Sequence, residues 1–69
     1  MDWISVVSEN LARIRYDENS NTLEIEFKGG RLYQYFDVPV QVFEELRNAG
    51  SLGQYFNSNI KGYYRYARI

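Results

Sequence analysis

Two adjacent glycines, Gly29 and Gly30, are the feature that most restricts how this chain can fold. They separate two segments of alternating apolar and polar residues, TLEIEF (22–27) and RLYQYFDV (31–38). Such alternation is typical of strands with one buried face, and paired glycines between strands are typical of a tight hairpin loop. If the two glycines form the loop, the predicted cross-strand pairs are Phe27 with Leu32, Ile25 with Gln34, and Leu23 with Phe36.

A third segment, LARIRYD (11–17), has the same period and precedes the turn-rich residues 18–21. Because that loop and the glycine loop agree on one buried face, we expect a three-stranded antiparallel meander. Ala12, Ile14 and Tyr16 are predicted to share the buried face, where Gln34 is the polar exception and needs a partner. On this register Tyr16 faces Leu23 and Ile14 faces Ile25. The outward face then carries two predicted rows, Arg13–Glu26–Tyr33 and Arg15–Glu24–Tyr35.

Two short helices are predicted after the strands. Pro39 suits a helix start, and Val42, Phe43 and Leu46 form an apolar stripe at helical spacing before Gly50. Ser51 and Gln54 match a capping box, and the second stripe is Leu52, Tyr55, Phe56 and Ile60. The end segments, 1–10 and 63–69, are candidates for additional strands. The predicted fold class is α+β, a three-stranded antiparallel meander packed by two short C-terminal helices, with an extra terminal strand as an option.

The residue types present argue against catalysis. The chain has 69 residues, which we expect to form a single domain, 1–69, and it contains no cysteine and no histidine. The usual nucleophiles, bases and transition-metal ligands are therefore missing, so we predict no enzyme, no cofactor and no metal site. Glu24 and Glu26 have the spacing of a glycosidase pair, but ion pairing with Arg13 and Arg15 is the simpler reading. No segment is apolar enough to span a membrane, and no signal peptide is recognisable, which predicts a cytoplasmic protein.

Charge is distributed unevenly along the chain and suggests two surfaces for a nucleic acid. Residues 1–45 carry nine acids and four bases, whereas residues 46–69 carry four bases and no acid. The first candidate surface is the outward sheet face, formed by Arg13, Arg15, Arg31, Tyr33 and Tyr35. The second is the tail, formed by Lys61, Tyr63, Arg65 and Arg68.

Each candidate surface has a purely structural alternative. The two sheet tyrosines can instead cover the stems of the neighbouring arginine and glutamate side chains or contact the C-terminal segment. The tail can instead be a solvated basic edge without a ligand. Tyr55, Phe56 and Ile60 are predicted to belong to the core rather than to a binding surface.

The order of motifs resembles the KTSC domain, a domain found at the C-terminus of some lysyl-tRNA synthetases and in small stand-alone bacterial proteins. The resemblance covers about residues 8–66 and rests on YDENSNTLEIEFKGGRLYQYFDVP, VFEEL and SLGQYFNSNIKGYY. Its central motif is Y-x-Y, which here is Tyr33-Gln34-Tyr35. The resemblance implies a compact α+β domain of undetermined function, for which the fusion partner suggests RNA binding.

Two functions remain open on these observations. The first is an RNA-binding accessory module that contacts single-stranded or structured RNA. The second is a protein–protein interaction module that uses the aromatic face or an unpaired sheet edge. Neither function requires a membrane.

Overall fold

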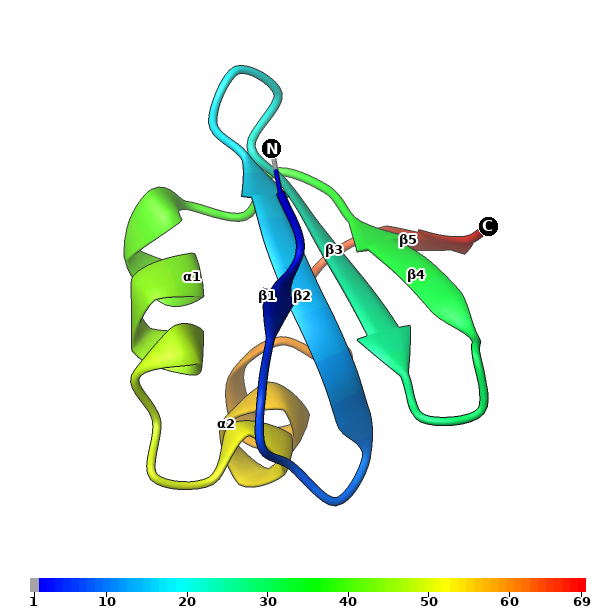
Figure 1. Ribbon diagram of the computed structural model, residues 1–69. Coiled ribbons are helices and arrows are strands. Elements are labelled where there is room, and N and C mark those ends of the chain that lie inside the picture. Colours follow the sequence, from blue (N-terminus) through cyan, green and yellow to red (C-terminus); the bar gives the residue numbers. More distant parts are fainter. Residues whose placement is uncertain (1) are drawn as a thin grey trace.

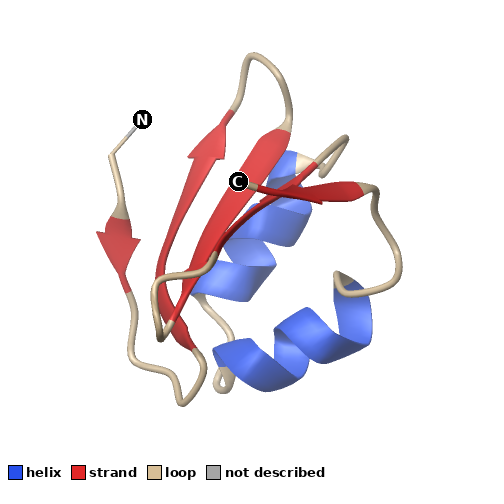
Figure 2. Ribbon diagram, turned by 90° about the vertical axis from the view of Figure 1, so that its right-hand side faces the viewer, coloured by secondary structure: helices blue, strands red, loops and turns tan. Residues whose placement is uncertain are grey.

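Within residues 2–69, the part of the chain that the computed structural model describes, a five-stranded antiparallel sheet carries two helices on one face (Figures 1 and 2). This confirms the α+β class, and both ends of the chain add a strand to the predicted meander. No helix of this part is long and apolar enough to cross a membrane. The elements are β1 (Ile4–Ser5), β2 (Leu11–Asp17), β3 (Thr22–Phe27), β4 (Leu32–Tyr35), α1 (Val40–Arg47), α2 (Leu52–Asn59) and β5 (Tyr66–Arg68), and the strands lie in the sheet in chain order.

The first hairpin has the predicted register at its centre, because Ile14 lies opposite Ile25 and Tyr16 opposite Leu23. The start of β2 differs from the prediction. A bulge between Leu11 and Arg13 inserts one residue, so Leu11 rather than Ala12 is the buried side chain there. A bulge leaves one residue unpaired and shifts the alternation of faces, which explains the error.

The predicted register of the second hairpin is wrong by one residue. Ile25 lies opposite Tyr33 and Leu23 opposite Tyr35. The loop contains Lys28 as well as the two glycines, because the Phe27 N–H donates to the Arg31 carbonyl at 2.8 Å. Gly29 and Gly30 have φ of 100° and 91°, values that L side chains rarely adopt. A slip of one residue moves every side chain of a strand to the opposite face.

This slip turns β4 over relative to the prediction. Tyr35 is only 5% exposed and faces the helices, whereas Leu32, Gln34 and Phe36 lie toward the outer face. The polar exception is thereby resolved, since the Gln34 side-chain amide donates to Glu24 on the outer face at 2.8 Å. Asp37, with φ of 58°, then interrupts the alternation, and Val38 returns to the core.

The core lies between the sheet and the two helices. The rings of Tyr16 and Phe43 stack with centroids 5.0 Å apart, and the Tyr16 hydroxyl donates to the Val38 carbonyl inside the core. The predicted core positions of Phe56 and Ile60, in and directly after α2, are confirmed, whereas Tyr55 is half-buried at the edge of the core. The predicted cap is present as well, because the hydroxyl of Ser51 accepts the N–H of Gln54 at 3.3 Å. The buried set comprises Leu11, Ile14, Tyr16, Leu23, Ile25, Tyr35, Val38, Phe43, Leu46, Leu52, Phe56 and Ile60.

Candidate nucleic-acid interface

The outer sheet face does not form the surface predicted from the sequence. Arg13 and Arg15 pair with Glu26 and Glu24 as expected, and the Trp3 ring covers both guanidinium groups at 4.6 and 4.3 Å. Tyr33 and Tyr35 lie on the opposite face because of the register of β4. The proposed combination of these tyrosines with Arg13 and Arg15 is therefore wrong.

The basic tail is divided between the two faces. Arg65 pairs with Asp37 at 2.9 Å and lies 5.5 Å from the ring centroid of the outward-facing Phe36. Arg68, in contrast, lies opposite Tyr33 in the β4–β5 pair and so shares the helix-facing side with it. Lys61 is exposed, as expected, in the turn that follows α2, and Tyr63 in the same turn is exposed as well.

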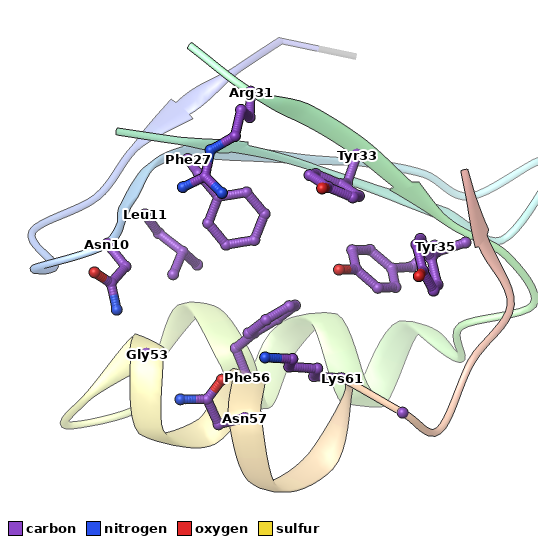
Figure 3. Close-up of a pocket in the computed structure, with 12 residues that line it drawn as sticks. Asn10, Leu11, Phe27, Arg31, Tyr33, Tyr35, Gly53, Phe56, Asn57 and Lys61 are labelled. Atoms are coloured by element: carbon purple, nitrogen blue, oxygen red, sulfur yellow. The ribbon is translucent and has the colours of Figure 1, made fainter. Parts of the chain in front are cut away.

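An open groove of about 560 Å³ lies between the helix-facing side of β4 and α2 (Figure 3). Its volume falls within the range of about 300–1,000 Å³ that is common for ligand pockets. Figure 3 shows side chains from the sheet and from the helix pointing toward one another across it. Five of the twelve lining residues are aromatic, namely Phe27, Tyr33, Tyr35, Phe56 and Tyr66.

The aromatic rings of the groove support one another in a continuous wall. Phe27 meets Tyr33 edge to face at 5.5 Å, and Tyr35 meets Phe56 in the same way at 5.5 Å. Tyr66 lies 5.9 Å from Tyr33 and 5.8 Å from Tyr35, yet remains 61% exposed. Rings held in this way need little further ordering, so Tyr66 offers a positioned and accessible ring for a flat ligand to stack on.

The groove is positively charged. Among the residues that the structure describes, its lining includes Arg31 and Lys61 but no aspartate or glutamate. Within residues 2–69, the ion pairs use Arg13, Arg15, Arg47 and Arg65, whereas Lys28, Arg31, Lys61 and Arg68 take part in none. The free cations thus line the groove or lie near it, while Glu24 and Glu26 occupy the other face of the sheet. This separation favours binding of an anion despite a net charge of −1.

The hydroxyl of Tyr35 points into the groove (Figure 3). Burial raises the pKa of Tyr35 to about 12, with smaller contributions from the neighbouring hydroxyls of Tyr33 and Tyr66. Burial, together with a 2.6 Å hydrogen bond to Glu45, raises the pKa of Tyr55 to about 12 as well. At neutral pH the Tyr35 hydroxyl is therefore protonated, and it can donate and accept hydrogen bonds in the groove.

These raised pKa values predict that the fold loses stability in alkaline solution. An unfolded tyrosine titrates near pH 10, whereas Tyr35 and Tyr55 in the folded state titrate near 12. Deprotonation therefore favours the unfolded chain, and the free energy of unfolding should fall as the pH rises from about 10 to about 12. Urea unfolding at a series of pH values measures this fall, and ultraviolet absorbance follows tyrosinate formation. Tyr35→Phe should remove part of the late titration; titration of all seven tyrosines near pH 10 contradicts the prediction.

The structure brings together four of the residues named from the sequence and adds others. Arg31, Tyr33, Tyr35 and Lys61 line one groove, although on the opposite side of the sheet from the one predicted for the tyrosines. Phe27 and Phe56 were assigned only to buried stripes, since periodicity does not distinguish a core ring from one at the edge of a groove. The acid-free segment 46–69 was the sequence signal that pointed toward this region.

Comparison with known proteins agrees with this architecture. The KTSC domain model matches residues 7–64. The lysine–tRNA ligase of Nostoc sp. (strain PCC 7120) is 49% identical over 55 residues, which are 80% of this chain but 10% of the ligase. The chain thus spans only about a tenth of the length of that relative. An uncharacterized protein of Stutzerimonas stutzeri (strain A1501) is 41% identical over 70 residues, covering 100% of this chain and 99% of that protein.

A solved structure supports the same assignment. The crystal structure of a KTSC domain protein from Yersinia pestis superposes with a TM-score of 0.93 at 33% sequence identity. The superposition covers 99% of this chain and 96% of that one. Since the family model, a small relative of matching length and a solved fold all coincide, the chain belongs to the KTSC domain family.

Proposed function

We propose that this domain is an RNA-binding accessory module without catalytic activity of its own, and that its aromatic groove receives unpaired nucleotides. The observation that carries the proposal is the coincidence of aromatic rings and free cations in a groove without acidic side chains. A base can stack on Tyr66 at the mouth of the groove, while Arg31 and Lys61 contact the phosphates on either side. Stacking is worth about 1–3 kcal/mol per base and tolerates any base.

The groove favours single-stranded over duplex RNA. The rings lie between the sheet and α2, so a base must be free of its pairing partner to place a face against them. In a duplex the faces of the bases are covered by their neighbours, and only phosphates and riboses remain accessible. Unpaired loops or ends of a structured RNA satisfy the same requirement.

Two further observations support an RNA ligand. The position of Glu24 and Glu26 on the far side of the sheet removes the repulsion that these carboxylates would exert on a phosphate backbone. In addition, three relatives carry the name lysine–tRNA ligase, which associates similar domains with an enzyme named for an RNA substrate. An RNA ligand is consistent with the cytoplasmic location expected from the sequence.

Fluorescence anisotropy with a labelled single-stranded oligoribonucleotide tests the proposal directly. We expect tighter binding to the single strand than to a duplex of the same composition. The logarithm of the affinity should fall linearly with the logarithm of the salt concentration, with a slope of about −1.4 if two phosphates are contacted. Absence of binding to any single strand at low salt contradicts the proposal. A specific protein partner that remains bound after nuclease treatment would then favour the protein-interaction function.

Replacing Tyr66 by leucine tests the stacking step. Tyr66→Leu should weaken binding of the single strand by about 5- to 150-fold, because one stacked base contributes about 1–3 kcal/mol. Tyr63→Leu is a matched control, since Tyr63 is 70% exposed and does not line the groove. Equal losses in the two variants would show that the groove ring has no special role.

A further inference from the structure

A second hollow, of about 680 Å³, adjoins the aromatic groove along α2. The two share Asn10, Gly53 and Asn57 in their linings. In Figure 3 these three residues lie toward the end of the groove away from Tyr35. The two hollows therefore adjoin at the first turn of α2.

Gly53 leaves this passage open. It lies inside α2 with no left-handed φ, and a Cβ built there would meet only the Ser8 hydroxyl, at an ordinary contact distance of 3.8 Å. The fold therefore does not require glycine at this position, and glycine is a poorer helix former than alanine. What the missing side chain does provide is free space where the two hollows meet.

The second hollow has its own free cation. Lys28 lines it, is exposed, and takes part in no ion pair within residues 2–69. The Lys28 backbone N–H donates to the Asn10 carbonyl at 2.8 Å, which holds the hairpin loop against the shared part of the lining. The lining also includes Glu9, so this hollow is less positive than the groove, and Val7, which is 97% exposed.

We propose that the groove and the second hollow form one track for a single-stranded RNA of at least two nucleotides. The first base stacks in the aromatic groove, the backbone passes over Gly53, and the next phosphate reaches Lys28. The exposed Val7 offers an apolar surface to the second base or its ribose. This inference rests on the proposed function and adds the length of the ligand and its direction across the domain.

Binding measured by NMR titration against uridine monophosphate, the dinucleotide UpU and the tetranucleotide of uridine tests the track. Wild-type affinity should rise by about fivefold or more from the mononucleotide to the tetranucleotide, since one added charged contact or stacked base is worth at least that much. Lys28→Ala should remove most of this gain and leave binding of the mononucleotide within about twofold, because Lys28 lines the second hollow but not the aromatic groove. Gly53→Gln places a long side chain where the two hollows meet and should also remove most of the gain. Arg31→Ala should weaken binding of all three ligands.

The outcomes separate this inference from the proposed function. Binding of the mononucleotide without any gain for longer ligands overturns the track and leaves the groove in place. A gain that survives both Lys28→Ala and Gly53→Gln also overturns it, because the added nucleotides then lie elsewhere. Failure of all three ligands and of longer single strands overturns both proposals. The NMR spectrum of each variant shows whether its fold is intact, and Gly53→Ala provides a milder substitution at the same position.

Discussion

Exchanging Arg31 and Lys61 together for glutamate is expected to abolish measurable binding of single-stranded RNA. Both side chains line the aromatic groove, and neither takes part in an ion pair within residues 2–69. A hydrogen bond to a charged group contributes about 1.5–3 kcal/mol, so loss of two such contacts predicts a decrease in affinity of about 100-fold or more. Two carboxylates in place of two cations add repulsion of the phosphates to this loss.

A matched control distinguishes the groove from the overall charge of the domain. Arg47→Glu combined with Arg65→Glu changes the net charge by the same amount, and both arginines lie outside the groove in exposed ion pairs with Glu44 and Asp37. Exposed pairs of this kind contribute about 0–1 kcal/mol to stability, so the control variant should fold. Anisotropy titrations at one salt concentration should show only a small decrease in the affinity of the control variant for single-stranded RNA. An equal loss of affinity in both double variants means that binding responds to net charge alone. An unchanged affinity in the groove variant means that the RNA does not bind in the groove.

Replacing Phe43 by alanine is expected to cost about 3–5 kcal/mol of unfolding free energy. Phe43 is 3% exposed and stacks on Tyr16, whose hydroxyl donates to the buried Val38 carbonyl. Removing the ring leaves a cavity between α1 and the sheet. The Tyr16 ring then loses a packing partner, so its hydrogen bond to the Val38 carbonyl is held less firmly. Because small domains have low total stability, such a loss is expected to populate the unfolded state without denaturant.

Urea denaturation followed by Trp3 fluorescence measures this loss. Trp3 is the single tryptophan of the chain, and its ring lies over Arg13 and Arg15 on the sheet. Val7→Ala is the control, because Val7 is 97% exposed and its truncation should change stability by no more than about 0.5 kcal/mol. A loss below about 1 kcal/mol for Phe43→Ala would place Phe43 outside the core.

The first hairpin and both helices could be predicted from local patterns. Residues 18–21 form a loop next to which both flanking strands alternate regularly, so only one register buries Ile14, Tyr16, Leu23 and Ile25 together; the bulge at Leu11 lies at the far end of β2. The helices have stripes at helical spacing and, in α2, a cap at Ser51. Local agreement of pattern and turn residues is sufficient in such segments, because no distant contact is needed to choose between alternatives.

The face of β4 could not be predicted in this way. Either Tyr33 and Tyr35 or Leu32 and Phe36 could occupy the buried face of β4. Tyrosine suits a half-buried position as well as an exposed one, so the residue types do not decide between them. The choice depends on Lys28, which makes the loop three residues long, and on the helix-facing space that the Tyr35 ring fills against Phe56. The number of residues in the loop decides which set of alternating side chains faces the helices. The periodicity within the strand does not reveal this choice.

The sequence alone therefore determined an α+β domain, its first hairpin, its helices and the acid-free C-terminal third, because these features depend on residues close together in the chain. Tertiary structure alone decided that Tyr33 and Tyr35 face the helices, that Trp3 covers the guanidinium groups of Arg13 and Arg15, and that Arg31 and Lys61 line one groove. The physical reason is that a groove is a property of surfaces brought together by packing. Its composition depends on which face each strand presents, and one additional loop residue is enough to reverse that face.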